Sequence, residues 1–301
     1  MSKLRLGQVD YVNCLPVYTA IEEGIVPLEA QIIKGHPTEL NNKFLAGELD
    51  ITPISSIEYA RNADQCIILP DLSISADGQV MSILLFSKVP VTELEGKTVC
   101  LPSSSATSVV LLKILLEHYY QVGVNYVTTK PELDAMLAVG DAALLIGDDA
   151  MRADVKLRYK KQNSGLFVYD LGVAWKEFTG EAMVYAVWVI HRDFASGNAK
   201  QVGEVVDALH ASRNWGLENV NHLLEVGHQR SPQFSLEYLV EYFGTIKHRL
   251  DESYRRALNC YFDYAYKSGL IPERVKLSIW GETSENSQYT GKSDAGKTAK
   301  P

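Results

Sequence analysis

The stretch that most constrains the fold joins an apolar strand to a helix through a turn crowded with hydroxyl groups. Residues 97–101 form a short apolar run typical of a buried strand, and residues 109–119 are apolar and long enough for a helix. The hydroxyls between them belong to Ser103, Ser104, Ser105, Thr107 and Ser108. The first turn of a helix leaves backbone N–H groups unpaired and carries partial positive charge, which predicts an anion site here. Plain N-capping, which needs only one hydroxyl, is the competing interpretation.

The same order of strand, polar turn and helix recurs along the chain. Asn13 follows a strand at residues 4–9, and Ser55 and Ser56 follow a short strand at residues 51–54. Gly147 and Asp148 come directly after the apolar residues 142–146, with capping by the aspartate as the competing interpretation. Strands that alternate with helices predict parallel α/β layers, whose ligands bind beyond the carboxyl ends of the strands.

The remaining elements follow from apolar patterning. Further strands are expected at residues 31–34, 66–69, 79–87, 124–127, 167–171 and 183–191. Further helices are expected at residues 38–46, 57–61, 131–139, 200–214, 217–226, 235–243 and 251–268. Residues 70–78 are predicted to be irregular. Ser82 is then an isolated hydroxyl within an extended run, and it matters only if its face lines a cleft.

The element order predicts two lobes with a ligand cleft between them. The chain leaves the first lobe near Lys88 and returns near Val187. Lobe I is therefore discontinuous, comprising residues 1–88 and 187–282, and lobe II comprises residues 89–186. Residues 283–301 are rich in Ser, Gly and Lys and lack an apolar period, which predicts a disordered tail.

Composition excludes several classes of function. The net charge is −8 and no run of Lys or Arg precedes the tail, so a basic nucleic-acid-binding face is not expected. Neither GxGxxG nor a P-loop is present, which argues against a nucleotide ligand. The four cysteines are scattered without a CxxC pair, so we expect reduced thiols and no metal site. No stretch is long and apolar enough to span a bilayer and no apolar leader opens the chain, which predicts a cytoplasmic protein.

Several short segments, taken in order, resemble one family. They are residues 7–16, 47–50, 54–60, 69–74, 77–78, 82–87, 105–108, 146–148 and 185–188. The family that they resemble is chorismate dehydratase, the first enzyme of the futalosine route to menaquinone, and the likeness runs from about residue 4 to residue 280. The sequence departs from the family pattern at Val12–Cys14, often Leu-Asn-Thr, and at Gln79–Met81, where a Pro-Val pair is common. The resemblance implies the fold of type II periplasmic binding proteins.

The same resemblance implies a dehydration of chorismate to 3-[(1-carboxyvinyl)oxy]benzoate, with no cofactor and no metal. It implies that Asn13 and Ser82 are the catalytic polar residues. The groups expected to bind substrate are Ser55, Ser56, Ser105, Ala106, Thr107, Ser108, Gly147 and Asp148. Among these, Ser105, Thr107 and Ser108 are assigned to the ring carboxylate, and Ser55 and Ser56 to the other carboxylate. Our hypothesis for the base is the enolpyruvyl carboxylate of the substrate itself, oriented by Asn13 and Ser82, which are also suited to bind the departing hydroxyl.

Three alternatives remain open at this point. A solute-binding protein without catalysis shares the expected fold. The sister enzyme of the same route, 1,4-dihydroxy-6-naphthoate synthase, would require a catalytic histidine in the second lobe, where His118 is placed more than two turns into a helix. A ligand-sensing regulator would require a DNA-reading module, which the polar tail does not provide. The sequence also leaves open whether the chain forms a homodimer.

Overall fold

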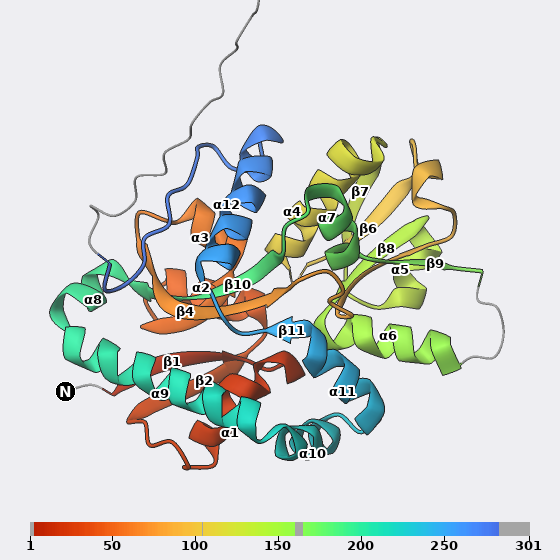
Figure 1. Cartoon of the computed structure of the whole chain (residues 1–301). Coiled ribbons are helices and arrows are strands. Elements are labelled where there is room, and N and C mark those ends of the chain that lie inside the picture. The colour runs from red at the N-terminus through yellow and green to blue at the C-terminus, as the bar shows by residue number, and fades with distance from the viewer. Residues whose placement is uncertain (1–2, 104, 160–164, 283–301) are drawn as a thin grey trace, which may run out of the picture.

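Two β-sheets organise the chain, each flanked by helices (Figure 1). The computed structural model describes residues 3–103, 105–159 and 165–282, so Ser104 and the predicted tail lie outside it. In the described residues, the six-stranded sheet has the order β11-β4-β10-β3-β1-β2 and the five-stranded sheet the order β7-β6-β8-β5-β9. The α/β class predicted from the sequence is confirmed.

The first sheet contains both the first and the last strand of the described chain. Its strands are β1 (Leu4–Val9), β2 (Ala30–Gly35), β3 (Ile51–Ser55), β4 (Cys66–Ala76), β10 (Met183–His191) and β11 (Ile246–Lys247). The strand β1 pairs in parallel with β2 and β3, whereas β10 runs antiparallel to β3 and β4. The amino end of β10 therefore lies beside the carboxyl end of β3, with Ala186 opposite Ser55.

The second sheet also contains both parallel and antiparallel strand pairs. Its strands are β5 (Ile83–Ser87), β6 (Thr98–Pro102), β7 (Asn125–Thr129), β8 (Ala142–Ile146) and β9 (Phe167–Asp170). The strand β6 is parallel to β7 and β8, and β5 is antiparallel to β8 and β9. The chain passes from the first sheet to the second between β4 and β5 and returns between β9 and β10. The division into lobes at residues 88 and 187 stays a prediction.

Helices cover the faces of both sheets (Figure 1). Those before β9 are η1 (Val12–Cys14), α1 (Leu15–Glu22), α2 (Pro37–Leu45), α3 (Ser56–Arg61), η2 (Val91–Glu93), α4 (Ala106–Ile114), η3 (Leu115–Tyr120), α5 (Leu133–Val139) and α6 (Gly147–Tyr159). Those after it are α7 (Leu171–Thr179), α8 (Arg192–Gly197), α9 (Ala199–Glu218), α10 (Val220–Arg230), α11 (Leu236–Thr245) and α12 (Glu252–Lys267). The helix expected at residues 109–119 is α4 followed by the π-helical turn η3.

Two expectations about the extended segments are wrong. Residues 70–78 were expected to be irregular, but β4 continues to Ala76. The strand accommodates Pro70 because its pairing with β10 skips from Ser73 to Ile68, and the intervening Asp71 has a φ of 47°. The second error concerns residues 79–87, because β5 begins only at Ile83 and Ser82 lies in a bend before it.

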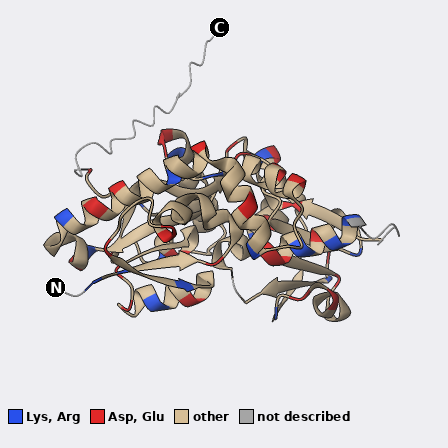
Figure 2. Cartoon of the chain, turned by 90° about the horizontal axis from the view of Figure 1, so that it is seen from below, with Lys and Arg blue, Asp and Glu red and all other residues tan. Residues whose placement is uncertain are grey.

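The interior is apolar and the surface carries charges of both signs. One large cluster of buried side chains includes both faces of the first sheet, and Leu85 and Leu144 extend it into the second. The alternate residues Leu84 and Phe86 face a second, smaller cluster beneath α5 and α6. Acidic and basic residues are interspersed in the view of Figure 2. Within the described residues, no helix is long and apolar enough to cross a membrane.

Candidate active site

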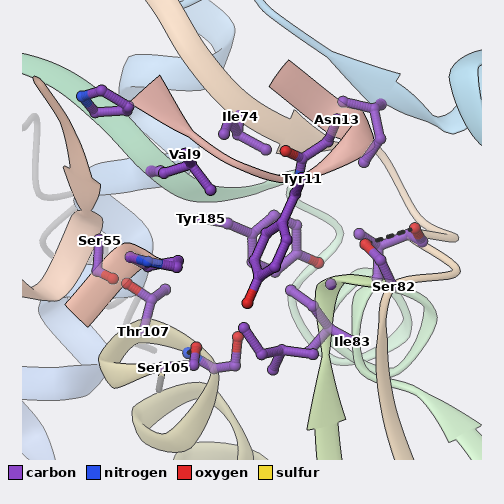
Figure 3. Close-up of a pocket in the computed structure, with 18 of the residues that line it drawn as sticks. Val9, Tyr11, Asn13, Ser55, Ile74, Ser82, Ile83, Ser105, Thr107 and Tyr185 are labelled. Carbon is purple, nitrogen blue, oxygen red and sulfur yellow. Dashed lines mark hydrogen bonds between the residues drawn. The ribbon is translucent and has the colours of Figure 1, made fainter. Parts of the chain in front are cut away.

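A cleft opens where the carboxyl ends of β1, β3 and β8 face one another. The space between the atoms of the cleft measures about 610 Å³, part of which is open solvent. Figure 3 shows Ser55, Ser105 and Thr107 at one end of the cleft and Ser82 and Asn13 toward the other, with the rings of Tyr11 and Tyr185 between them. The cleft therefore has two polar ends separated by apolar and aromatic surface.

The first polar end is built on the amino terminus of α4. The strand β6 ends at Pro102, and Ser105 caps the helix by accepting a hydrogen bond from the Ser108 backbone N–H at 3.4 Å. Thr107 is buried, and its Oγ1 accepts a hydrogen bond from the Ile57 backbone N–H at 3.1 Å. This bond joins α4, which follows β6 of the second sheet, to the first turn of α3, which follows β3 of the first sheet. The helix terminus gives this end a positive potential without a charged side chain.

The two serines at the end of β3 have different surroundings. Ser55 lines the cleft and its side chain makes no capping hydrogen bond to α3. Ser56 is fully buried, and its hydroxyl donates to the Val184 carbonyl at 2.8 Å. Of this pair, Ser55 is therefore the hydroxyl free to meet a ligand.

The second polar end holds Asn13 in a rigid backbone setting. Asn13 lies in η1, between β1 and α1, and Pro16 occupies the first turn of α1 as expected from the sequence. The Nε2–H of buried His248 donates to the Asn13 carbonyl, with 2.6 Å between the heavy atoms. Burial lowers the pKa of His248 to about 4, so this histidine is neutral and acts as a fixed donor. The Asn13 Oδ1 is buried without a hydrogen-bond partner among the described residues.

Ser82 is fixed by the loop that precedes β5. Met81 has a φ of 61°, a conformation that side chains other than glycine rarely adopt. The Asp170 carboxylate holds this loop by accepting hydrogen bonds from the backbone N–H groups of Val80 at 3.0 Å and Met81 at 2.7 Å. Because β5 is antiparallel to β8, Ser82 at its amino end lies beside the carboxyl end of β8 and lines the cleft.

Gly147 lies between Ser82 and the ring of Tyr11. Its N–H donates to the Ser82 carbonyl at 2.7 Å, and its φ is 56°. A Cβ at this position would lie 2.7 Å from the ring of Tyr11, so only glycine allows this approach. Asp148 follows it, buried behind the cleft, and its Oδ1 accepts a hydrogen bond from the Val12 N–H at 3.5 Å. Burial raises the pKa of Asp148 to about 6.

The structure brings together seven of the ten predicted site residues as cleft lining. These are Asn13, Ser55, Ser82, Ser105, Thr107, Ser108 and Gly147. Ser56, Ala106 and Asp148 do not line the cleft. The substrate roles assigned to all ten stay predictions.

Two tyrosines that sequence reasoning missed also line the cleft. Tyr11 follows β1, and its ring packs against Gly147. Tyr185 lies on β10 next to Ala186. The position of Tyr185 follows from the antiparallel direction of β10, which the parallel α/β prediction did not include. The segment 185–188 had been marked only by its resemblance to a family.

No charged side chain is found among the lining residues that the structure describes. His118, the histidine considered for the alternative enzyme, instead contacts the Ser268 hydroxyl at 2.8 Å and the ring of Tyr264. In the described part of the chain, no group of three or more His, Cys, Asp or Glu side chains is arranged to hold a metal ion. The chemistry available at the cleft is therefore that of neutral hydroxyls, one carboxamide and a helix terminus.

Solved structures with the same fold include binding proteins. A crystal structure of a protein from Archaeoglobus fulgidus superposes with a TM-score of 0.73 at 22% identity, covering 89% of this chain and 98% of that one. The periplasmic aliphatic sulphonate binding protein SsuA from Escherichia coli has a TM-score of 0.62 at 16% identity, covering 92% and 97%. These likenesses confirm the periplasmic-binding-protein-like fold predicted from the sequence.

Relatives in sequence are biosynthetic enzymes. A chorismate dehydratase from Thermus thermophilus is 30% identical over 85% of this chain and 93% of its own length, and one from Campylobacter jejuni is 28% identical over 60% and 64%. A 1,4-dihydroxy-6-naphtoate synthase from Streptomyces coelicolor is 23% identical over 75% and 79%. A family model described as menaquinone biosynthesis matches residues 4–267. By this match, and by its identity to the Thermus enzyme, the chain belongs to the menaquinone biosynthesis family.

Proposed function

We propose that this protein is a chorismate dehydratase, a hydro-lyase that converts chorismate to 3-[(1-carboxyvinyl)oxy]benzoate and water. The observation that carries the proposal is the neutral cleft of a menaquinone biosynthesis protein, with hydroxyls and a helix terminus at one end and Asn13 and Ser82 at the other. Chorismate matches this layout because it is a ring with carboxylates and a hydroxyl at its edges. The chorismate dehydratases among its relatives support the same substrate.

The first polar end suits the ring carboxylate. When the C3 hydrogen leaves as a proton, negative charge spreads through the ring double bond onto the C1 carboxylate. The terminus of α4 and the hydroxyls of Ser105, Thr107 and Ser108 stabilise charge at that position. Because the charge grows in the transition state, this stabilisation lowers the barrier and not only the ground-state energy.

The second polar end suits the reacting edge of the ring. No residue lining the cleft in the described chain is an acid or a histidine, so we propose that the enolpyruvyl carboxylate of chorismate removes the C3 proton. Asn13 and Ser82 orient that carboxylate or bind the departing hydroxyl. The gain in aromaticity supplies the driving force for loss of water.

The two other functions fit the site less well. A naphthoate synthase was expected to use a histidine in the second lobe, but His118 contacts the Ser268 hydroxyl and is not among the residues that line the cleft. A purely binding role is compatible with the fold, but binding alone gives no reason for family membership in menaquinone biosynthesis.

Purified protein mixed with chorismate tests the proposal directly. We expect chorismate to disappear and a stable aromatic enol ether to form, followed by absorbance and mass spectrometry, with turnover that survives a metal chelator. Asn13→Ala and Ser82→Ala are expected to lower kcat far more than they weaken binding. Asn41→Ala and Ser212→Ala, which change buried polar residues outside the cleft lining, are the matched controls and retain turnover. Unchanged chorismate with the wild-type protein would refute the proposal.

A further inference from the structure

The hydroxyl of Tyr11 is not used by the fold of the protein. Tyr11 is half-buried and lines the cleft, and its hydroxyl makes no hydrogen bond to any described residue. A core tyrosine behaves differently, because Tyr18 donates to the Gly7 carbonyl at 2.7 Å. The Tyr11 hydroxyl also borders the open space of the cleft, whereas the hydroxyls of Tyr185 and Tyr242 are enclosed. A ligand in the cleft can therefore reach it.

Two neighbours fix the ring of Tyr11. Gly147 lies so close that a Cβ at this position would be 2.7 Å from the ring. The ring of His36 meets it edge-on, with 6.0 Å between the ring centroids and 63° between the planes. In Figure 3 the hydroxyl points away from Asn13 and toward the first polar end, where Ser105 lies. A side chain held in this way loses little further conformational entropy when its hydroxyl binds a ligand.

The groups already present at the first polar end are hydrogen-bond donors. The N–H groups in the first turn of α4 have no acceptor within the helix. The Ser105 oxygen accepts a hydrogen bond from the Ser108 N–H, and the serine keeps its own O–H to donate. A ligand group placed among these donors is best satisfied if it accepts hydrogen bonds only.

Tyr11 adds a donor that keeps its proton. Burial is the main cause that raises the pKa of its phenol far above the ordinary value. The charges of Asp149 and Asp148 raise the pKa further, and Arg152 opposes them. The phenol is therefore neutral at physiological pH and can donate. A carboxylate accepts several hydrogen bonds and donates none, so it suits this hydroxyl and the terminus of α4 together.

We propose that the Tyr11 hydroxyl donates a hydrogen bond to the ring carboxylate of chorismate, together with the terminus of α4, and is a further catalytic residue. This inference rests on the proposed chorismate dehydratase function. Tyr11 follows β1 of the first sheet, whereas Ser105 and α4 follow β6 of the second, so the carboxylate is held from both sides of the cleft. Tyr11 keeps its proton throughout, and its hydrogen bond strengthens as negative charge arrives on the carboxylate in the transition state.

The test compares two variants that each lose one hydroxyl. Tyr11→Phe removes the proposed donor and keeps the ring against Gly147. Tyr264→Phe is the matched control, because Tyr264 is also half-buried without a described hydrogen-bond partner and packs against Trp175 and Phe178 outside the cleft lining. We expect kcat with chorismate to fall at least roughly tenfold for Tyr11→Phe, as when a transition-state donor is lost, and to be unchanged for Tyr264→Phe. Both variants should keep the thermal midpoint of the wild type, because neither hydroxyl is paired within the protein.

Binding measurements show which carboxylate Tyr11 contacts. The reaction product carries both carboxylates, whereas 2-phenoxyprop-2-enoate keeps the enol ether carboxylate and lacks the one on the ring. A hydrogen bond to a charged group contributes about 1.5–3 kcal/mol, so the Kd of the product should rise at least roughly tenfold in Tyr11→Phe. The Kd of 2-phenoxyprop-2-enoate should be the same in Tyr11→Phe and in the wild type, because Tyr11 has no group to contact in that ligand.

Three results would overturn the inference: an unchanged kcat in Tyr11→Phe, equal losses of affinity for the two ligands, or a Tyr11→Phe protein that is less stable or does not fold. The comparison of the two ligands does not depend on turnover. Failure of the wild-type protein to convert chorismate therefore refutes the proposed function, while the two Kd values still decide whether Tyr11 contacts an aromatic carboxylate.

Discussion

Replacing Asp148 with asparagine should change how the stability of this protein depends on pH. Asp148 is buried in the first turn of α6, and its pKa rises from 3.8 to about 6 on folding. Burial is the main cause, and the Asp149 and Asp10 charges add to it, while the Val12 N–H and Arg152 oppose it. Since a change of one in pKa corresponds to 1.36 kcal/mol, the ionised carboxylate lowers the free energy of unfolding by about 3 kcal/mol above pH 6.

The sign follows from proton binding. Between pH 4 and pH 6 the folded state holds the Asp148 proton and the unfolded state does not, so the free energy of unfolding falls as pH rises. His248, with its pKa lowered from 6.5 to about 4, acts in the opposite direction in nearly the same range, because only the unfolded state binds its proton. In the wild type the two slopes largely cancel.

Asp148→Asn removes the pH dependence due to Asp148 and leaves the opposite pH dependence due to His248. The free energy of unfolding of the variant should gain about 2 kcal/mol relative to the wild type between pH 4 and pH 7.5. Urea unfolding at a series of pH values measures this difference, and any fixed cost of the new amide cancels from it. A difference between Asp148→Asn and wild type that is constant with pH would refute the reasoning.

Three further predictions concern the cleft. Gly147→Ala should raise KM and lower the free energy of unfolding by at least about 1–2 kcal/mol, because the left-handed backbone and the Tyr11 ring both exclude a Cβ. Steady-state kinetics measure the first effect and chemical denaturation the second. Asp170→Ala should lower both kcat and stability by releasing the Met81 loop, whereas Asp251→Ala, which removes a similar helix cap far from the cleft, should lower stability alone. Added salt should raise kcat/KM slightly, because it screens the repulsion between a dianion and a protein of net charge −8; a decrease would indicate a basic group at the site.

Much of the framework was predictable because it depends on local patterns. The strands at residues 4–9, 142–146 and 183–191 have the predicted bounds. The last two are apolar along most of their length, and apolar and polar residues alternate at the start of the first. The Ser105 cap and the helix after it were likewise predictable from the hydroxyl-rich turn. These features arise within about ten residues of sequence, where propensity and capping act directly.

The errors occur where distant contacts override local preference. Pro70 was taken to end a strand, but β4 continues because the skipped register with β10 removes the need for its missing N–H. Ser82 lies outside β5 because Asp170, about ninety residues later, holds Met81 at a positive φ. Tyr185 was missed because its position depends on the direction of β10 within the sheet, which a strand pattern does not reveal.

The neutral character of the cleft connects these observations. An arginine or lysine at the first polar end would bind a carboxylate strongly before and after reaction, so it would stabilise substrate and product along with the transition state. Hydroxyls and the terminus of α4 bind more weakly, and their interaction grows as negative charge arrives at the carboxylate.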